Sequence, residues 1–391
     1  MNVVIASAVR TPIGAFQGAF ASVKASRLGA VAVQEAVRRA GIAPEDVELV
    51  LMGNVLQAGQ GQAPARQAAI YAGLPEATPA VTVNKMCGSG LETVIQAARA
   101  VALGDAEIVV AGGMESMTNA PYLLPGARGG LRLGNATAVD SMVHDGLWDV
   151  YEDKHMGSCA ELCATKYTFT RQEQDAYAER SYRRAQAASE DGTFAAEIVP
   201  VEVEGKRGAV TRVERDEGPS QVDFAKMTTL RPAFEKEGTV TAANASTLND
   251  GAAALVVTTE EVAKRRGMPV LAHLRGYAGH AVAPEWFTIA PVGAMQKLFD
   301  RTGWAPAEVD VYEINEAFSV VPMAAMKEFS LDPERVNVHG GAVALGHPIG
   351  ASGARIMVTL LNALARRGQR RGVAGICIGG GEGLAMAVET A

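Results

Sequence analysis

The sequence CGSG at residues 87–90 begins an alanine-rich stretch that leads into the apolar run 108–111 and then a pair of glycines. The same order returns near the end of the chain, where GASG at residues 350–353 begins a stretch that leads into the apolar run 375–378 and three glycines. Each copy has the pattern of a helix followed by a buried strand of a parallel sheet. Two copies in corresponding order indicate a duplicated domain with a pseudo-two-fold core, and two unrelated strand-helix-strand units are the alternative.

The regions that flank the two copies continue the alternation of short β-branched runs with alanine-rich stretches, as expected for an α/β fold. Buried strands are predicted at 49–52, 108–112 and 374–378, and a further strand-like segment lies at 80–83. The middle of the chain differs, because residues 120–240 carry glycine-rich loops, a polar helix at about 171–191 and a charged alternating segment at 199–204. We interpret this middle region as an inserted, more solvated part of the protein.

Composition excludes several classes of protein. Of the 391 residues 48% are hydrophobic and 20% are charged, which is typical of a globular protein rather than a disordered one. No apolar run of about 18 residues is long enough to span a bilayer. The formal net charge of −7, without an extended basic block, argues against nucleic-acid binding. Because the first ten residues read as a strand rather than a signal peptide, a cytoplasmic location is expected, with reduced cysteines.

Cys87 lies where the predicted strand 80–83 and a short link meet the small residues that begin a helix. Backbone N–H groups and the positive end of the helix dipole would favour a thiolate there, so Cys87 is a candidate nucleophile. The alternative is a small buried apolar side chain, since free cysteine is often buried.

His347 lies in the loop GHPIG, where Pro348 forces the preceding backbone out of the helical region. A histidine held in this way can act as a general base, although a lone loop histidine can equally be a surface residue or a hydrogen-bonded spacer.

Cys377 lies near the end of a predicted buried strand, and Asn315 directly follows another apolar segment. Cys377 precedes three glycines whose backbone can approach a ligand closely, and ligands of open sheets bind beyond such strand ends. Asn315 could orient a water or donate to an oxyanion, or it could cap a helix. The duplication assigns Cys87 to one copy and His347 and Cys377 to the other, around equivalent loops.

Other signals are weaker. Cys159 and Cys163 lie four residues apart on a predicted helix without further ligands at zinc-site spacing, so packing is their expected role. The glycine clusters do not form a dinucleotide-binding fingerprint after a first strand. No serine lies in the setting of an acyl-hydrolase nucleophile.

Taken together, the motifs resemble those of the thiolases, and the resemblance extends over the whole chain. Its opening is RTPIG at 10–14 and its close is CIGGG at 377–381. Between them lie four specific stretches: NKMCGSG at 84–90, TAANASTLNDG at 241–251, NEAF at 315–318 and GGAVALGHPIG at 340–350.

The resemblance implies a thiolase fold, in which two similar halves stack as α-β-α-β-α layers and a loop domain is inserted in the first half. The expected pattern of each half is βαβαβαββ. The implied boundaries are residues 1–118 with 246–270 for the N-terminal half, 119–245 for the inserted loop domain that binds coenzyme A, and 271–391 for the C-terminal half.

The resemblance also implies the catalytic roles. Cys87 would take up the acetyl group as a thioester, and His347 would be the base that activates it. Cys377 would exchange the proton on the α-carbon of the second acetyl-CoA. Asn315 would hold a water that forms one oxyanion hole with His347, and the backbone N–H groups of Cys87 and Gly379 would form the other. A cysteine thioester divides a Claisen condensation into two easier acyl transfers.

For coenzyme A, the resemblance points to Ser246 at the pantetheine arm and to the loop domain for the rest, with His155 and Met156 lining the acyl and pantetheine end. The HMGSCAE stretch that begins at His155 looks like the short-chain acetoacetyl type, in which a bulky wall limits the acyl group to about four carbons. Further substrate positions match at Tyr182, Val222, Asp223, Lys226, Ala317 and Phe318.

The comparison with the family adds one ion site, and it shows one position at which this chain differs from many relatives. No cofactor is required, but potassium-activated relatives hold an ion near positions that all match here: Tyr182, Ala242, Ala243, Ala245 and Val343. Many bacterial relatives carry an arginine near the coenzyme A nucleotide where this chain has Ser220, so Lys226 or Arg231 would have to contact the phosphates instead.

The implied activity is that of an acetyl-CoA acetyltransferase, which reversibly condenses two acetyl-CoA molecules to acetoacetyl-CoA and coenzyme A. A 3-ketoacyl-CoA thiolase of broader chain length, or one of the β-ketoadipyl kind, is the alternative with the same catalytic residues. A carrier-protein ketosynthase would have histidine in place of Cys377. A non-catalytic thiolase-fold scaffold is the more distant alternative. The resemblance further implies a homotetramer built from two tight dimers, with acyl-CoA as the partner molecule.

Overall fold

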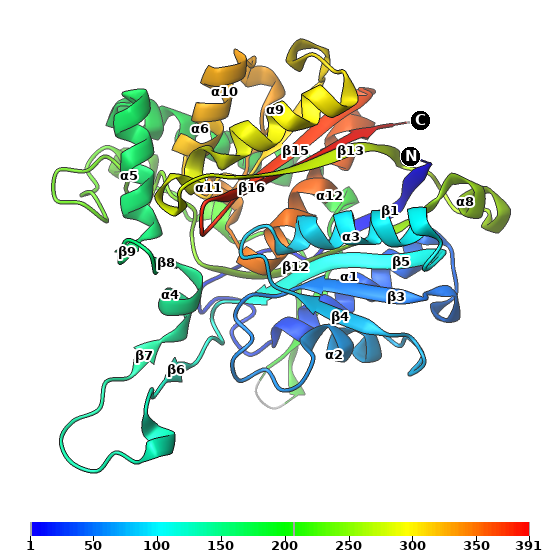
Figure 1. Cartoon of the computed structure of the whole chain (residues 1–391), viewed down its shortest axis with the longest axis horizontal. Coiled ribbons are helices and arrows are strands. Elements are labelled where there is room, and N and C mark those ends of the chain that lie inside the picture. Colours follow the sequence, from blue (N-terminus) through cyan, green and yellow to red (C-terminus); the bar gives the residue numbers. More distant parts are fainter. Residues whose placement is uncertain (1, 206–207, 391) are drawn as a thin grey trace.

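The computed structural model describes residues 2–205 and 208–390 (Figure 1). Its ten-stranded main sheet divides into two parts built on the same plan, which we call the N-terminal and the C-terminal sheet. In the N-terminal sheet the strand order is β4, β3, β5, β12, β1. The β3–β4 and β3–β5 pairs are parallel, whereas β12 is antiparallel to both β5 and β1. The bounds are β1 Val3–Arg10, β3 Leu49–Gly53, β4 Ala80–Val83, β5 Ile108–Ser116 and β12 Asn249–Thr259, with the short β2 Gly14–Ala15 pairing with β12.

The C-terminal sheet repeats this plan with the order β14, β15, β16, β13. The β14–β15 pair is parallel, and β16 is antiparallel to both β15 and β13. Two residue pairs between β1 and β13, Val4 with His273 and Ile5 with Ala272, join the two sheets. The bounds are β13 Ala272–Ala281, β14 Val311–Ile314, β15 Arg371–Ile378 and β16 Glu382–Glu389.

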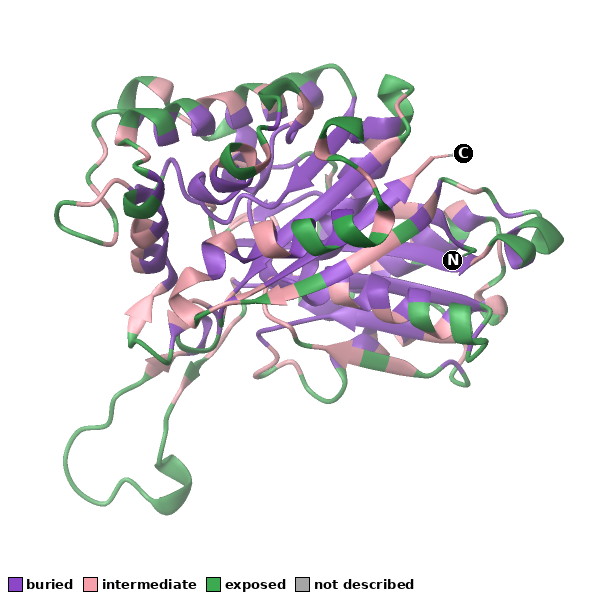
Figure 2. Ribbon diagram, turned by 45° about the horizontal axis from the view of Figure 1, so that its top comes forward, coloured by how far each residue is buried: buried purple, intermediate pink, exposed green. Residues whose placement is uncertain are grey.

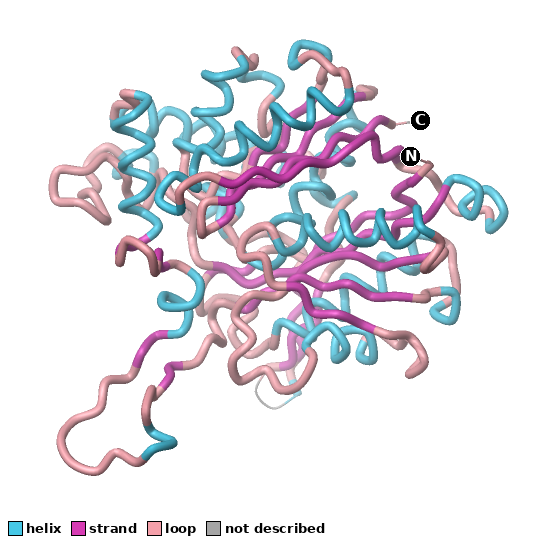
Figure 3. The backbone as a smooth tube through the Cα atoms, viewed as in Figure 1, coloured by secondary structure: helices cyan, strands magenta, loops and turns pink. Residues whose placement is uncertain are grey.

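Helices form three layers around the sheets (Figure 3). α1 (Ala25–Ala40) and α2 (Pro64–Tyr71) cover the outer face of the N-terminal sheet, and α9 (Ala290–Thr302) and α10 (Val320–Phe329) cover that of the C-terminal sheet. α3 (Ser89–Leu103) and α12 (Ile349–Arg367) lie between the sheets. The result is the expected α-β-α-β-α arrangement, and the predicted duplication is confirmed.

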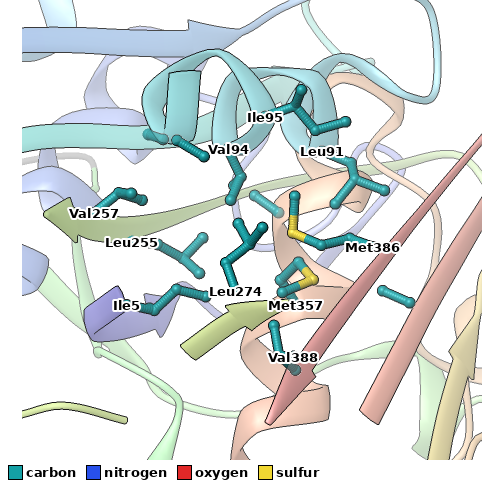
Figure 4. Close-up of a cluster of buried hydrophobic side chains, with 14 of the residues drawn as sticks. Ile5, Leu91, Val94, Ile95, Leu255, Val257, Leu274, Met357, Met386 and Val388 are labelled. Atoms are coloured by element: carbon teal, nitrogen blue, oxygen red, sulfur yellow. The ribbon is translucent and has the colours of Figure 1, made fainter. Parts of the chain in front are cut away.

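The two central helices touch because glycines lie at their contact. A Cβ atom on Gly90 would come within 2.6 Å of the backbone nitrogen of Ala354, and one on Gly353 within 2.3 Å of that of Leu91. Side chains from both sheets close the core around this contact, including Leu255, Leu274 and Met386 (Figure 4). Burial of each such side chain contributes about 1.5–3 kcal/mol, so the central layer is a major source of stability.

The segment between β5 and β12 forms the inserted region. Part of it is a projecting arm, in which residues 124–138 are all exposed (Figure 2). The rest packs on the core, so the prediction of a solvated region is right for the arm and wrong for α5, where Cys159 and Cys163 are buried. The bounds are β6 Tyr122–Leu123, β7 Val139–Asp140, α4 Ser141–Gly146, β8 Trp148–Asp149, β9 Lys154–His155, α5 Met156–Tyr167, α6 Arg171–Glu190, β10 Val201–Glu204, β11 Val210–Val213 and α7 Phe224–Met227.

A buried arginine ties this region to the core. Arg10 at the end of β1 is fully buried, and its guanidinium donates two hydrogen bonds to Asp216, at 2.7 and 2.9 Å, and one to Glu197. Asp216 also accepts a hydrogen bond from the backbone N–H of Ile13, at 2.8 Å. Because Arg10 carries countercharge for both carboxylates, it fixes the segment that leads to Gly218 at the cavity described below.

Two short helices complete the fold, α8 (Glu260–Arg266) after β12 and α11 (Ala342–Leu345) before the loop that carries His347. The strands predicted at 49–52, 80–83, 108–112 and 374–378 are confirmed by β3, β4, β5 and β15. Across the described part of the chain, no helix combines the length and the apolar character that a membrane crossing requires.

Candidate active site

A cavity of about 660 Å³ opens where the two halves and the inserted region meet. Ten of the residues predicted for catalysis or substrate binding line it: Cys87, His155, Met156, Tyr182, Val222, Ser246, Ala317, Phe318, His347 and Gly379. Residues from both ends of the chain therefore contribute to one site, as the duplication predicts.

Cys87 is held by a tight turn between β4 and α3. Met86 has a φ of 46°, in the left-handed region, and its N–H donates to the side chain of Asn84 at 3.0 Å. Ser89 fixes the other side of the turn, because its hydroxyl donates to the carbonyl of Met86 at 2.6 Å and accepts from the N–H of Lys85 at 2.8 Å. Such over-determined backbone strain is common at functional residues.

Burial raises the pKa of the Cys87 thiol to about 11, although hydrogen bonding from the backbone N–H of Gly379 acts in the opposite direction. Burial therefore opposes the thiolate that was expected at the helix N-terminus. Cys87 needs a base to become a nucleophile, and the same cavity wall contains one.

His347 is the candidate for that base and lies in the loop before α12. Its backbone N–H donates to the side-chain oxygen of Asn249 at 3.0 Å, and its Nδ1 lies 2.6 Å from the hydroxyl of Ser352. The single proton of that hydroxyl is directed to the carbonyl of Pro348, at 3.0 Å, so we assign the proton of this contact to Nδ1 of His347. Nε2 then carries a free lone pair, and it has no hydrogen-bond partner among the described residues.

The imidazole is neutral at ordinary pH. Burial lowers the pKa of His347 to about 3, and the positive charge of Arg355 contributes in the same direction. A neutral imidazole with a free lone pair on Nε2 is able to accept a proton.

Cys377 lies behind the cavity wall rather than on it. It is fully buried at the end of β15, and its pKa is raised well above the ordinary value, first by burial and then by the charge of Cys87. The thiols are therefore close enough to interact, and Gly379, which follows Cys377 by two residues, reaches the cavity surface. Cys377 can exchange a proton only with a molecule that penetrates to this depth.

Asn315 is also absent from the cavity wall. Its side chain is fully buried, and neither its oxygen nor its nitrogen has a partner among the described residues. The helix-cap alternative is wrong, because α10 begins at Val320 and the residue at its N-cap is Ser319. The backbone N–H of Asn315 donates to the carbonyl of Gly375 at 2.9 Å, which fixes the residue beside β15. A buried amide without partners is unfavourable by about 1–3 kcal/mol, so this side chain is suited to a water or an oxyanion.

Aromatic rings form one wall of the cavity, at the predicted acyl end. The ring of His155 stacks on Phe234 with centroids 4.7 Å apart, and Phe318 packs edge-on against Phe234 and Phe287 at 6.1 and 6.4 Å. The Nδ1 atom of His155 accepts the N–H of Gly157 at 3.0 Å and thereby caps α5. Phe234 and Phe287 were not predicted from the sequence, because an aromatic residue in a loop carries no signal of what it will pack against.

Two predicted coenzyme A residues lie outside the cavity wall. Asp223 at the N-cap of α7 and Lys226 on that helix are exposed, and they form an ion pair of 3.0 Å with each other. Ser220 is also exposed, and its hydroxyl donates to the carbonyl of Glu217 at 2.9 Å. Contacts of these residues with the nucleotide stay a prediction.

The residues predicted around potassium lie together at one side of the cavity. Tyr182, Ala242 and Ala245 line it, while Ala243 and Val343 pack with Tyr182 in one cluster. The pKa of Tyr182 is raised to about 12 by burial and by the charge of Glu316. A hydroxyl and backbone carbonyls are oxygen donors that suit a hard cation, and the described residues contain no cluster of three or more His, Cys, Asp or Glu side chains for a transition metal.

Comparisons with known proteins agree with this geometry. The family model for the thiolase N-terminal domain matches residues 3–261, and that for the thiolase C-terminal domain matches residues 268–390. The chain is 53% identical to acetyl-CoA acetyltransferase 1 of Arabidopsis thaliana, over 99% of this chain and 94% of the relative. It is 50% identical to a cytosolic acetyl-CoA acetyltransferase of Gibberella zeae, over 99% and 98%. A crystal structure of the Acat5 thiolase from Ascaris suum in complex with coenzyme A superimposes with a TM-score of 0.95 at 44% identity, over all of both chains.

Proposed function

The chain belongs to the thiolase family and is an acyltransferase, and from this premise we propose that it acts as an acetyl-CoA acetyltransferase. It would join two acetyl-CoA molecules to acetoacetyl-CoA and free coenzyme A, and run the reverse thiolysis with the same groups. The observation that carries the proposal is the meeting of Cys87, the free Nε2 of His347 and the N–H of Gly379 in one cavity.

In the first half-reaction, Nε2 of His347 removes the thiol proton of Cys87, and the sulfur attacks the carbonyl carbon of acetyl-CoA. The N–H groups of Cys87 and Gly379 stabilise the oxyanion, at roughly 3 kcal/mol for each donor. The bond from the carbonyl carbon to the coenzyme A sulfur then breaks, and the proton on His347 passes to the departing sulfur. The products are acetylated Cys87 and coenzyme A.

In the second half-reaction, the sulfur of Cys377 removes a proton from the methyl carbon of a second acetyl-CoA. A water held by Asn315, together with the protonated Nε2 of His347, stabilises the enolate oxygen. The carbon attacks the acetyl group on Cys87, and the bond from that group to the Cys87 sulfur breaks. The thiol of Cys377 gives its proton to Nε2 of His347 before it acts as a base, and it regains a proton from the methyl carbon. Nε2 then returns its proton to the departing sulfur of Cys87, so both thiols end as they began. The high pKa of Cys377 makes its thiolate a strong base.

The aromatic wall of His155, Phe234, Phe287 and Phe318 supports a short acyl group. The test is thiolysis of 3-ketoacyl-CoA substrates of four to ten acyl carbons by purified protein. Activity confined to acetoacetyl-CoA is the expected result. Comparable rates with longer chains would instead identify a broad-range 3-ketoacyl-CoA thiolase, and no activity with any substrate would support a scaffold.

Potassium fits the oxygen donors around Tyr182, and it would hold the backbone of 242–245 next to Ser246 at the cavity. The expected effect is an increase in activity and in thermal stability when potassium replaces sodium at equal ionic strength. Equal melting temperatures and equal rates in the two salts would contradict the site.

Homotetramer formation is supported by the exposed arm 124–138, which carries Leu124, Leu131 and Leu133 in solvent. A tight dimer is supported by β4, an edge strand with Val81 47% exposed, because an unpaired strand edge is a template for pairing with a second chain. A cytoplasmic location is supported by the cytosolic relative in Gibberella zeae.

A further inference from the structure

The strand registers show which residues of the two halves occupy equivalent places. Gly53 of β3 pairs with Gly113 of β5, and Ile314 of β14 pairs with Gly375 of β15. The next residue along the first strand of each pair is an asparagine, Asn54 in one half and Asn315 in the other.

A second equivalence lies two residues further along β5 and β15. Glu115 follows Gly113 by two residues and Cys377 follows Gly375 by two, so Glu115 is the counterpart of Cys377. Both residues are fully buried. At the helix starts, the shared Ser-Gly sequence of α3 and α12 makes Gly350 the counterpart of Cys87. Asn54 and Glu115 of the N-terminal half, together with the start of α12 from the C-terminal half, therefore form a second set of asparagine, acidic group and helix start, in which a carboxylate replaces a thiol.

Glu115 binds four donors rather than a substrate. Its Oε2 accepts the N–H groups of Val55 and Gly350, at 3.0 and 2.9 Å. Its Oε1 accepts the side-chain amide of Asn54 at 2.7 Å and the N–H of Leu56 at 3.2 Å. One carboxylate thus connects β5, the loop after β3 and the first turn of α12.

The residues held in this way surround Cys87. Val55, Leu56 and Ile349 belong to one small apolar cluster, against which Met86 and Cys87 pack. Ile349 also lines the cavity and follows His347 by two residues. We propose that Glu115 is a positioning residue for acyl transfer, which fixes the first turn of α12 and the 54–56 loop around Cys87 and so holds His347 in place to activate the thiol.

The surroundings of Glu115 shift the pKa of its carboxyl group in both directions. Burial raises its pKa to about 7, the backbone N–H bonds lower it, and Asp250 on β12 raises it further. Cys87 is the other titratable group that faces it, and the charge of Glu115 adds to the effect of burial on the pKa of that thiol. A positioning role and a charge effect can therefore be separated by two substitutions at one residue.

Glu115→Asp keeps the charge but is too short to reach all four donors. Since a misplacement of 1 Å can reduce a rate about a hundredfold, we expect the acetylation of Cys87 by acetyl-CoA to slow at least tenfold, with KM changed less than threefold. Glu115→Gln removes the charge, and we expect the midpoint for alkylation of Cys87 by iodoacetamide to fall by roughly half a pH unit or more. Glu197→Gln is the matched control, a buried carboxylate at Arg10, and should leave that midpoint unchanged.

This inference rests on acyl transfer through Cys87, and the experiment separates the two claims. Wild-type protein that is never acetylated contradicts the proposed function. Acetylation of Glu115→Asp at the wild-type rate, in a protein whose wild type is acetylated, overturns the role of Glu115 alone. If either variant fails to fold, Asn54→Ala is the substitute, because it removes a single donor from Oε1 of Glu115. Acetylation that is slowed about twofold or more supports the positioning role of Glu115, whereas an unchanged rate overturns it.

Discussion

The Nδ1 atom of His347 and the hydroxyl of Ser352 lie 2.6 Å apart, on the loop and the first turn of the same helix. This contact fixes both the orientation and the tautomer of the imidazole, because the hydroxyl directs its own proton to Pro348. The base is thereby set up by local structure, before any substrate arrives.

Ser352→Ala should slow the acetylation of Cys87. Without the hydroxyl, the imidazole can turn and can carry its proton on Nε2, where it no longer acts as a base. We expect a loss of about tenfold to a hundredfold, within the roughly 10²–10⁴-fold contribution of general-base catalysis. Stopped-flow measurement of acetyl transfer gives the rate. Ser189→Ala removes a helical hydroxyl with the same bond to the carbonyl four residues before it, and an equal loss there would contradict the explanation.

Substitution of Cys87 and substitution of Cys377 should each abolish a different half-reaction. Cys87→Ser should not become labelled by radioactive acetyl-CoA, whereas Cys377→Ala should be labelled and should fail in condensation. The reason is that only Cys87 lines the cavity, while Cys377 lies behind it. Retention of the acetyl label by folded Cys87→Ser would refute the assignment of the nucleophile, and loss of both half-reactions in Cys377→Ala would refute the division between the thiols.

Phe287→Ala should extend the range of acyl chains. The ring is 2% exposed and packs on Phe318 at the cavity wall, so its removal opens space for further carbons. We expect thiolysis of a six-carbon substrate to rise relative to the four-carbon substrate by about tenfold or more, which corresponds to about 1.4 kcal/mol. Phe299→Ala, in the same core but away from the cavity, should lower stability by about 3–5 kcal/mol without changing this ratio. An unchanged ratio in Phe287→Ala would show that the wall lies elsewhere.

Arg10→Met should destabilise the protein strongly. It leaves Asp216 and Glu197 buried without their countercharge, for which about 3–5 kcal/mol is expected. Urea unfolding followed by circular dichroism measures the change. Arg183→Met removes one partner of an exposed ion pair and should change the free energy of unfolding by less than about 1 kcal/mol. Similar values for the two variants would contradict the anchoring role of Arg10.

Removal of residues 125–137, with a short glycine link in their place, should leave the active site intact and reduce the proposed tetramer to dimers. The arm is joined to the rest of its own chain through the short β6–β7 pairing at its base, so its leucines are available to another subunit. Light scattering after size-exclusion chromatography gives the mass. An unchanged mass in the shortened protein would exclude the arm as the tetramer contact.

Local sequence patterns were sufficient for the duplication, the strands at 49–52, 80–83, 108–112 and 374–378, and the candidates Cys87 and His347. Each depends on short-range physics, since small residues mark helix starts, Pro348 restricts the residue before it, and β-branched runs mark strands. These signals are complete within a few residues of the chain, so they can be read without knowing what packs against them.

Tertiary structure alone decided the rest of the site. It raised the pKa of the Cys87 thiol, because burial disfavours the charged form. It left the amide of Asn315 without partners among the described residues, and it brought Phe234 and Phe287 to the acyl wall. It also gave Glu115 four donors from separate segments. Burial and hydrogen bonding between distant segments depend on how the two halves pack, and that packing is a property of the whole chain rather than of any single stretch.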